Sequence, residues 1–224
     1  MRRRQFTVGV FGSGLFPLSA LAFSLSQGDA SLGVRTALER GARSAVSLLG
    51  RSDGFLGNPL VRIGLPGSLE SAAKLLKLFG QGYKVDELVT GMNRAAEAAV
   101  PLASELLVTA ARDISVEDAV KIVRGGDTSV TDYFARSTRE PLTMRFLPIV
   151  TRETEKLALS DKFNAVAARA SGFGLIKKDE ANLQQYVTGK ALDGLYLMIG
   201  EEERKIRKDP IGTGSDILRK VFGI

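Results

Sequence analysis

Apolar residues recur three and four positions apart along almost the whole chain, and this spacing most constrains the fold. Leu32, Ala45 and Leu49 belong to one such run near the N-terminus, and similar runs follow up to the last forty residues. No segment alternates convincingly between apolar and polar residues, as a half-buried strand would. The 224 residues therefore predict an all-α, single-domain multi-helix bundle of about eight helices.

Helix-capping and helix-breaking residues divide this pattern into segments. Asp29 is a candidate N-cap, Ser68 and Ser115 open further helices, and Pro101 bends or breaks a long one. Residues 50–66 hold Asp-Gly, Asn-Pro and Leu-Pro pairs and are expected to form a long irregular loop. The expected helices are residues 29–49, 68–79, 85–112, 116–124, 130–139, a segment that Pro141 restarts and Pro148 bends, 161–170 and 179–209, with a terminal turn at 215–222.

The first residues have the pattern of an export signal. Three arginines at positions 2–4 precede a mostly apolar run, residues 6–18, which ends at Ala20-Leu21-Ala22. A signal peptidase accepts such a small-x-small site. We expect residues 1–22 to be a signal peptide that is removed, and residues 23–224 to form a single α-helical domain in the periplasm.

Two alternatives remain for this segment. An uncleaved anchor could run over residues 6–25, although Pro17 and three glycines weaken it as a permanent helix. The second alternative is that the pattern is a coincidence at the N-terminus of a cytosolic protein. Arg3-Arg4-Gln5-Phe6 also resembles a twin-arginine signal, so the secretory and twin-arginine routes are both open. After cleavage, the only membrane contact expected is the one made by the signal itself.

The composition excludes several classes of chemistry. The chain has no cysteine and no histidine, which rules out thiolate nucleophiles, Ser-His-Asp triads and the usual zinc sites. Without the three signal arginines, 28 basic residues, three fewer than the 31 of the whole chain, face 25 acidic ones. This weak, interspersed charge argues against nucleic-acid binding. We expect no cofactor and no metal, and only carboxylate, lysine or tyrosine chemistry remains possible.

The last long helix contains the most unusual charge. Residues 191–199 are apolar almost all the way round, which predicts a position in the centre of the bundle. Asp193 lies in the middle of this run, and Lys190 is three residues earlier on the same face. The pair is expected either to neutralise itself inside the bundle or to form the floor of a pocket.

The same helix then becomes highly charged over residues 201–209. Glu202 and Ile206 are four residues apart and continue the apolar face of the preceding turns. Glu202 is therefore a candidate to point inward and meet an arginine, whereas the rest of the segment fits a solvated helix end.

Two further segments carry candidate residues. Residues 91–99 are rich in glycine and alanine, which lets two helices approach closely, and Asn93, Arg94 and Glu97 lie on one edge of that helix. Arg94 is a candidate partner for Asp193 or Glu202. In the 50–66 loop, Asp53 begins an Asp-Gly-Phe-Leu run, which forms either a turn plugged into the core or part of a site.

Several of these motifs together resemble a bacterial family catalogued as a domain of unknown function. The matching runs span nearly all of the expected mature chain: Asp53-Gly54-Phe55-Leu56, Asn58-Pro59, Met92 to Pro101, Gly125-Gly126-Asp127, Lys190 to Leu195, and Glu201-Glu202-Glu203 to Pro210. The family has no established activity, so the resemblance supplies no catalytic residue. It implies a helical, exported, periplasmic protein of proteobacterial type.

Two functions from different classes fit these observations. The first is a non-enzymatic envelope protein that binds an apolar small molecule or a protein partner. The alternative is a carboxylate-dependent hydrolase or lyase acting on a cell-envelope substrate, with its acid and base among Asp53, Glu97, Asp193 and Glu202. That chemistry needs two carboxyl groups about 5–10 Å apart across an open cleft.

Overall fold

The computed structural model describes residues 27–126, 128–159, 161–163, 182–209 and 212, and these residues form helices joined by turns. No strand occurs among them, which confirms the all-α prediction; their helices are fewer than the eight or so expected. They are α1 (Gln27–Leu49), the 3-10 turn η1 (Gly67–Leu69), α2 (Glu70–Leu78), α3 (Gly82–Ala99), the 3-10 turn η2 (Val100–Leu102), α4 (Ala103–Arg112), α5 (Val116–Arg124), α6 (Ser129–Lys156) and α8 (Leu183–Lys208).

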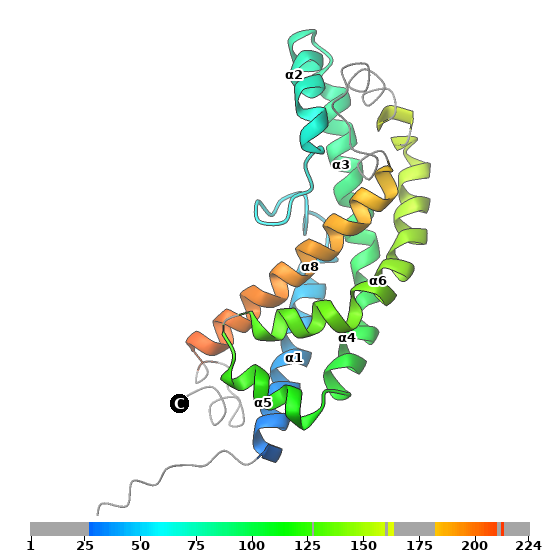
Figure 1. Cartoon of the computed structure of the whole chain (residues 1–224). Helices are drawn as coiled ribbons and strands as arrows, with labels where there is room; N and C mark the ends of the chain where they lie inside the picture. The colour runs from blue at the N-terminus through cyan, green and yellow to red at the C-terminus, as the bar shows by residue number, and fades with distance from the viewer. Residues whose placement is uncertain (1–26, 127, 160, 164–181, 210–211, 213–224) are drawn as a thin grey trace, which may run out of the picture.

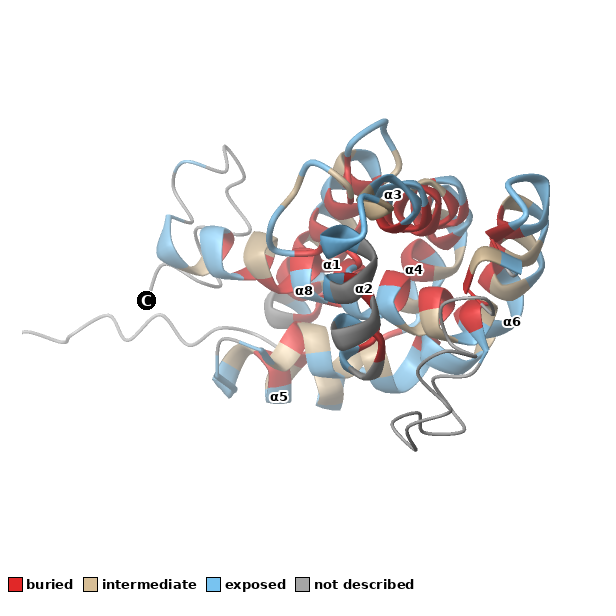
Figure 2. Cartoon of the chain, turned by 90° about the horizontal axis from the view of Figure 1, so that it is seen from above, coloured by how far each residue is buried: buried red, intermediate tan, exposed pale blue. Residues whose placement is uncertain are grey.

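Helices α1 and α8 organise the bundle. Helix α8 packs against α6, α1 and α3, while α1 also packs against α4 and α5 (Figure 1). Viewed along the bundle, the buried positions gather where α1, α3, α4 and α8 face one another (Figure 2). A core of this kind, with one apolar face per helix, is what the three- and four-residue spacing requires.

The spacing places the core residues as predicted. On α1, Val34, Leu38 and Leu49 are inaccessible to solvent, and on α8 Leu192 and Ile199 are nearly so. The prediction of a central helix at 191–199 holds, but one narrow stripe of α8 that includes Asp193 faces solvent.

The expected helix boundaries are mostly confirmed. Pro101 lies in η2, which separates α3 from α4 as the break in the 85–112 segment. The Ser115 hydroxyl accepts a hydrogen bond from the Asp118 amide at 3.0 Å and caps α5. Asp29 is not an N-cap, because α1 already begins at Gln27.

Pro141 and Pro148 do not divide the chain as expected, since both lie inside the single helix α6. A proline removes the amide that would bond the carbonyl four residues earlier. Those carbonyls belong to Ser137 and Met144, which are exposed residues, so water can satisfy them. The helix therefore continues, and it changes direction near its middle (Figure 1).

Helix α2 stands apart from the rest of the bundle. It packs against α3 and η1 and projects with the first turns of α3 at one end of the molecule. Leu78, Phe79 and Tyr83 lie at the turn between the two helices, with 81%, 77% and 58% of their surface exposed. We call residues 74–84, which close this hairpin, the α2–α3 tip.

None of the helices in the described ranges has the length and apolarity needed to cross a bilayer. The expected signal at 1–22, residues 164–170 of the predicted 161–170 helix, the predicted start at Asp179 and the terminal turn at 215–222 lie outside the described residues.

Candidate functional site

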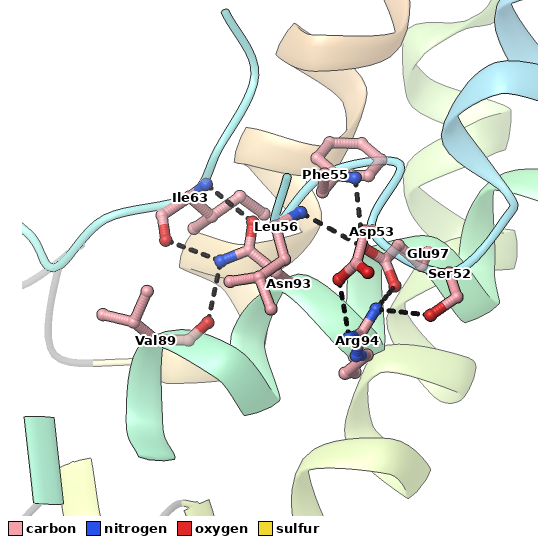
Figure 3. A network of polar contacts seen from close by, with 9 residues as sticks. All are labelled: Ser52, Asp53, Phe55, Leu56, Ile63, Val89, Asn93, Arg94 and Glu97. Carbon is pink, nitrogen blue, oxygen red and sulfur yellow. Dashed lines mark hydrogen bonds and ion pairs between the residues drawn. The ribbon is translucent and has the colours of Figure 1, made fainter. Parts of the chain in front are cut away.

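Four of the seven candidate residues of the sequence meet in one place, where the 50–66 loop lies on α3. Asn93, Arg94 and Glu97 project from α3 toward this loop, and Asp53 projects back from the loop (Figure 3). Asn93 is fully buried and Glu97 is 6% exposed. The alanine-rich sequence of α3 leaves room for the loop to lie directly against the helix. We call Asp53, Asn93, Arg94 and Glu97 the α3 cluster.

Glu97 binds backbone amides of the loop. Its Oε1 accepts hydrogen bonds from the amides of Phe55 at 3.0 Å and Leu56 at 3.1 Å. Its Oε2 accepts a bond of 2.7 Å from Nη1 of Arg94. A buried carboxylate is tolerated only when its oxygens are bonded in this way. The loop and Arg94 therefore satisfy the charge of Glu97 completely.

Arg94 joins the helix to the first turn of the loop. Its Nη2 lies 2.7 Å from Oδ1 of Asp53, and its Nη1 also donates to Oγ of Ser52 at 3.1 Å. Hydrogen bonding to Glu97 and then to Asp53 raises the pKa of the Arg94 guanidinium above its ordinary value. The guanidinium is thus a permanent cation shared by two carboxylates.

Asn93 holds the far end of the same loop. Its Oδ1 accepts a bond of 2.8 Å from the Ile63 amide, and its Nδ2 donates to the Ile63 carbonyl at 2.8 Å. The second hydrogen of Nδ2 goes to the Val89 carbonyl at 2.7 Å. One side chain thus provides the two bonds that a neighbouring strand would give to Ile63.

Glycines let the loop fit beneath α8. A Cβ atom on Gly54 would lie 2.4 Å from the Leu49 carbonyl oxygen, and one on Gly194 would lie 2.8 Å from a ring carbon of Phe55. Phe55 itself is fully buried. The turn that begins at Asp53, where φ is +62°, therefore inserts Phe55 into the core against α8. Of the two expectations for this run, the structure supports the plugged turn.

Chemically, the α3 cluster is suited to holding the loop and poorly suited to moving protons. Both carboxylates bind the same guanidinium, and Glu97 is sealed from water by the loop it binds. An acid–base pair needs one carboxyl group that faces a substrate across an open space. Whether any of these residues contacts a ligand remains a prediction.

The other three candidates lie elsewhere and have other partners. Asp193 is paired with Arg139 at 2.9 Å, with 54% of its side chain exposed, so the expected buried pair with Lys190 is wrong. The Lys190 ammonium lies 5.9 Å from the centre of the Tyr186 ring. The expected pairing of Arg94 with Asp193 or Glu202 is also wrong.

Glu202 binds a lysine of its own helix, at 2.6 Å from Lys205. The glutamate that points inward is its neighbour Glu203, which is 5% exposed. Glu203 accepts hydrogen bonds from the amides of Val130 at 3.2 Å and Thr131 at 3.3 Å, at the start of α6. The side chain of Thr128, the N-cap residue, accepts no hydrogen bond from the first backbone amides of α6, so Glu203 supplies the negative charge that a helix N-terminus favours.

Arg207 completes this second cluster. Its Nε donates to Glu203 at 3.0 Å and its Nη2 to the carbonyl of Ile122 at 3.0 Å, in the last turn of α5. Burial raises the pKa of Glu203, and the hydrogen bonds at Val130 and Arg207 oppose this shift. Sequence reasoning chose Glu202 and so missed this cluster by one position. The seven-residue steps from Leu192 to Ile199 and Ile206 place Glu203, four after Ile199, on the buried face.

Among the described residues, at least two surface hollows are large enough for a small molecule. One, of about 720 Å³, includes Arg43, Arg112 and Arg145 in its lining. The other, of about 510 Å³, includes Arg40, Glu202 and Lys205. In the part of the chain that the structure describes, no three acidic side chains gather where they could hold a metal ion.

A comparison with protein families matches residues 24–223 to the family described as "Protein of unknown function (DUF4197)". No curated protein and no solved structure matches the chain.

Proposed function

We propose that this chain, which belongs to the DUF4197 family, is a non-enzymatic interaction module of the cell envelope that binds its partner through the α2–α3 tip. The observation that carries the proposal is the exposure of Leu78, Phe79 and Tyr83 at the end of a projecting hairpin. Large apolar side chains grouped on a surface usually mark a contact with a partner or a membrane.

The α3 cluster supports a non-enzymatic role. Asp53 and Glu97 share Arg94, and Asp193 and Glu202 each bind a basic side chain of their own. The alternative, a carboxylate-dependent hydrolase or lyase, would need one of these groups to be available in a cleft. Glu202 does line one of the hollows, but there it is bound to Lys205 at 2.6 Å.

The linings of these two hollows favour a contact surface over a carrier of an apolar small molecule. Sites for apolar ligands are lined mainly by apolar and aromatic side chains. The two hollows instead have arginine, lysine and glutamate in their linings. The tip is where the described residues offer exposed apolar groups close together.

Export to the periplasm is part of the proposal. The family match begins at residue 24, next to Phe23, the first residue expected after cleavage at Ala22. Cell fractionation followed by N-terminal sequencing tests this. We expect periplasmic protein that starts at Phe23, and intact Met1 on cytosolic protein would contradict export.

The contact surface is tested by photo-crosslinking in living cells. A photoreactive amino acid replaces Phe79 in one strain and Met144 in a control strain. Met144 is a suitable control because it is 69% exposed on α6, outside the tip. We expect adducts, to protein or to lipid, from position 79 and not from 144. Equal labelling at both positions, or none at 79, would refute the tip as the contact surface.

A further inference from the structure

We infer that the α2–α3 tip docks onto a bilayer surface that contains anionic phospholipid. This deepens the proposed function by naming the partner of the same surface, and it rests on that function. It also replaces the sequence-based expectation that only the signal segment contacts a membrane.

The apolar part of the tip is shaped to enter a bilayer interface. Leu78 ends α2 and Phe79 begins the turn. Gly80 then reverses the chain with φ of +71°, a conformation that glycine adopts without strain. Tyr83 stands in the first turn of α3. The three large side chains therefore share one end of the molecule. Tyrosine and phenylalanine favour the level of the lipid headgroups.

The charges around this apolar group select an anionic surface. Lys74, Lys77 and Lys84 are exposed, and residues 74–84 contain no acidic residue. Within the described residues, none of the three forms an ion pair; Lys84 donates to the side chain of Gln81 at 3.1 Å. Lysines beside apolar side chains at a helix end can reach lipid phosphates while the apolar groups enter the interface.

The nearest acidic residues offset at most one of these three positive charges. Glu70 begins α2 at the opposite end from the tip. Glu87, one turn into α3, is paired with Lys162 at 2.9 Å. Asp86 is the remaining carboxylate next to the tip. A bilayer explains both the lysines and the apolar side chains, whereas an apolar protein groove explains only the latter.

Vesicle sedimentation tests the inference. The purified chain is mixed with vesicles of phosphatidylcholine alone, or of phosphatidylcholine with about one third phosphatidylglycerol. The variants are Leu78→Ser with Phe79→Ser, Lys74→Gln with Lys77→Gln and Lys84→Gln, and the control Met144→Ser. All share the mature N-terminus expected at Phe23, so the apolar run at 6–18 is absent from each and contributes to no binding. Far-UV circular dichroism checks that every variant folds.

We expect binding to the anionic vesicles that falls as salt is added. A cation near an anionic surface contributes about fivefold to partitioning, so the three lysine substitutions together should weaken binding about a hundredfold. The double serine variant should bind neither kind of vesicle above background, and Met144→Ser should bind like the unchanged protein.

Binding that is equal for both kinds of vesicle, or unchanged in the double serine variant, would overturn the inference. A second result would also overturn it: photo-adducts at position 79 that contain only protein, combined with no binding to vesicles. In that case the tip would still be a contact surface, but its partner would be a protein and not a bilayer. Absence of both vesicle binding and adducts at 79 would refute the proposed function as well.

Discussion

Replacing Glu97 tests whether the α3 cluster serves to hold the loop. Glu97→Ala removes the acceptor for two loop amides and the charge beside Arg94. A buried amide left without a partner costs about 1–3 kcal/mol, and a hydrogen bond to a charged group contributes about 1.5–3 kcal/mol. The Leu56 amide is only partly buried, so we count one orphaned amide and one charged bond. The expected loss of unfolding free energy is about 3–5 kcal/mol.

Two milder substitutions separate the contributions of the individual bonds to this loss of unfolding free energy. Glu97→Gln keeps an oxygen for Phe55 and Leu56 but turns an amide NH2 group, which cannot accept a hydrogen bond, toward Arg94. It should cost about 1.5–3 kcal/mol, the contribution of the lost charged bond. Asp53→Asn should cost at most about 1 kcal/mol, because that pair is largely exposed. Asparagine also tolerates the positive φ at this position.

Urea unfolding followed by circular dichroism at 222 nm measures all three variants. We expect the order Glu97→Ala, then Glu97→Gln, then Asp53→Asn, with an unchanged slope against urea concentration. Carboxylates kept for catalysis or ligand binding commonly reduce stability, so their removal tends to stabilise a protein. A Glu97→Gln variant as stable as the unchanged chain, or more so, would refute the loop-holding role.

Four further changes extend the test. Gly194→Ala should destabilise by about 1–3 kcal/mol through overpacking against Phe55, and equal midpoints in urea would contradict the close contact. Burial raises the pKa of Glu203 from the ordinary 4.5, so the folded chain binds that proton more tightly than the unfolded one. The free energy of unfolding of the unchanged chain, compared with that of Glu203→Gln, should therefore fall as pH rises from 4.5 through the raised pKa. If the two proteins gave parallel curves of unfolding free energy against pH, the expectation would be wrong. Arg207→Ala leaves Glu203 buried without its cation and should cost about 3–5 kcal/mol, measured in the same way. Pro148→Ala restores one helical hydrogen bond and should stabilise α6 by about 2 kcal/mol, and a lower melting temperature would count against it.

The fold was largely predictable because helical spacing depends on burial alone. The break at Pro101 and the cap at Ser115 follow from local backbone chemistry, and the structure has them where the sequence predicts them. Pro141 and Pro148 were misjudged for a tertiary reason. The free energy that a proline costs inside a helix depends on whether the carbonyl it leaves unbonded faces water. The spacing of apolar residues does not show which carbonyls face water.

The charged contacts were less predictable, because a partner across the bundle depends on helix rotation. Arg94 binds its own turn and the adjacent loop, whereas the sequence suggested distant residues of α8. The choice of Glu202 over Glu203 is an error of about 100° around one helix. The pairing of Asp193 with Arg139 depends on how α6 lies against α8, which no local pattern specifies.

Three of the motifs on which the family resemblance rests contact one another in the structure. Phe55 of the loop motif packs on Gly194 of the α8 motif, while Glu97 and Asn93 of the α3 motif bind the loop backbone at either end. Three segments distant in sequence thus depend on one another for packing and hydrogen bonding. A change in any one would expose buried amides or fill the space of Phe55. These three motifs are therefore accounted for by the requirements of the fold, and the α2–α3 tip, which none of these contacts explains, is the surface on which function should be sought.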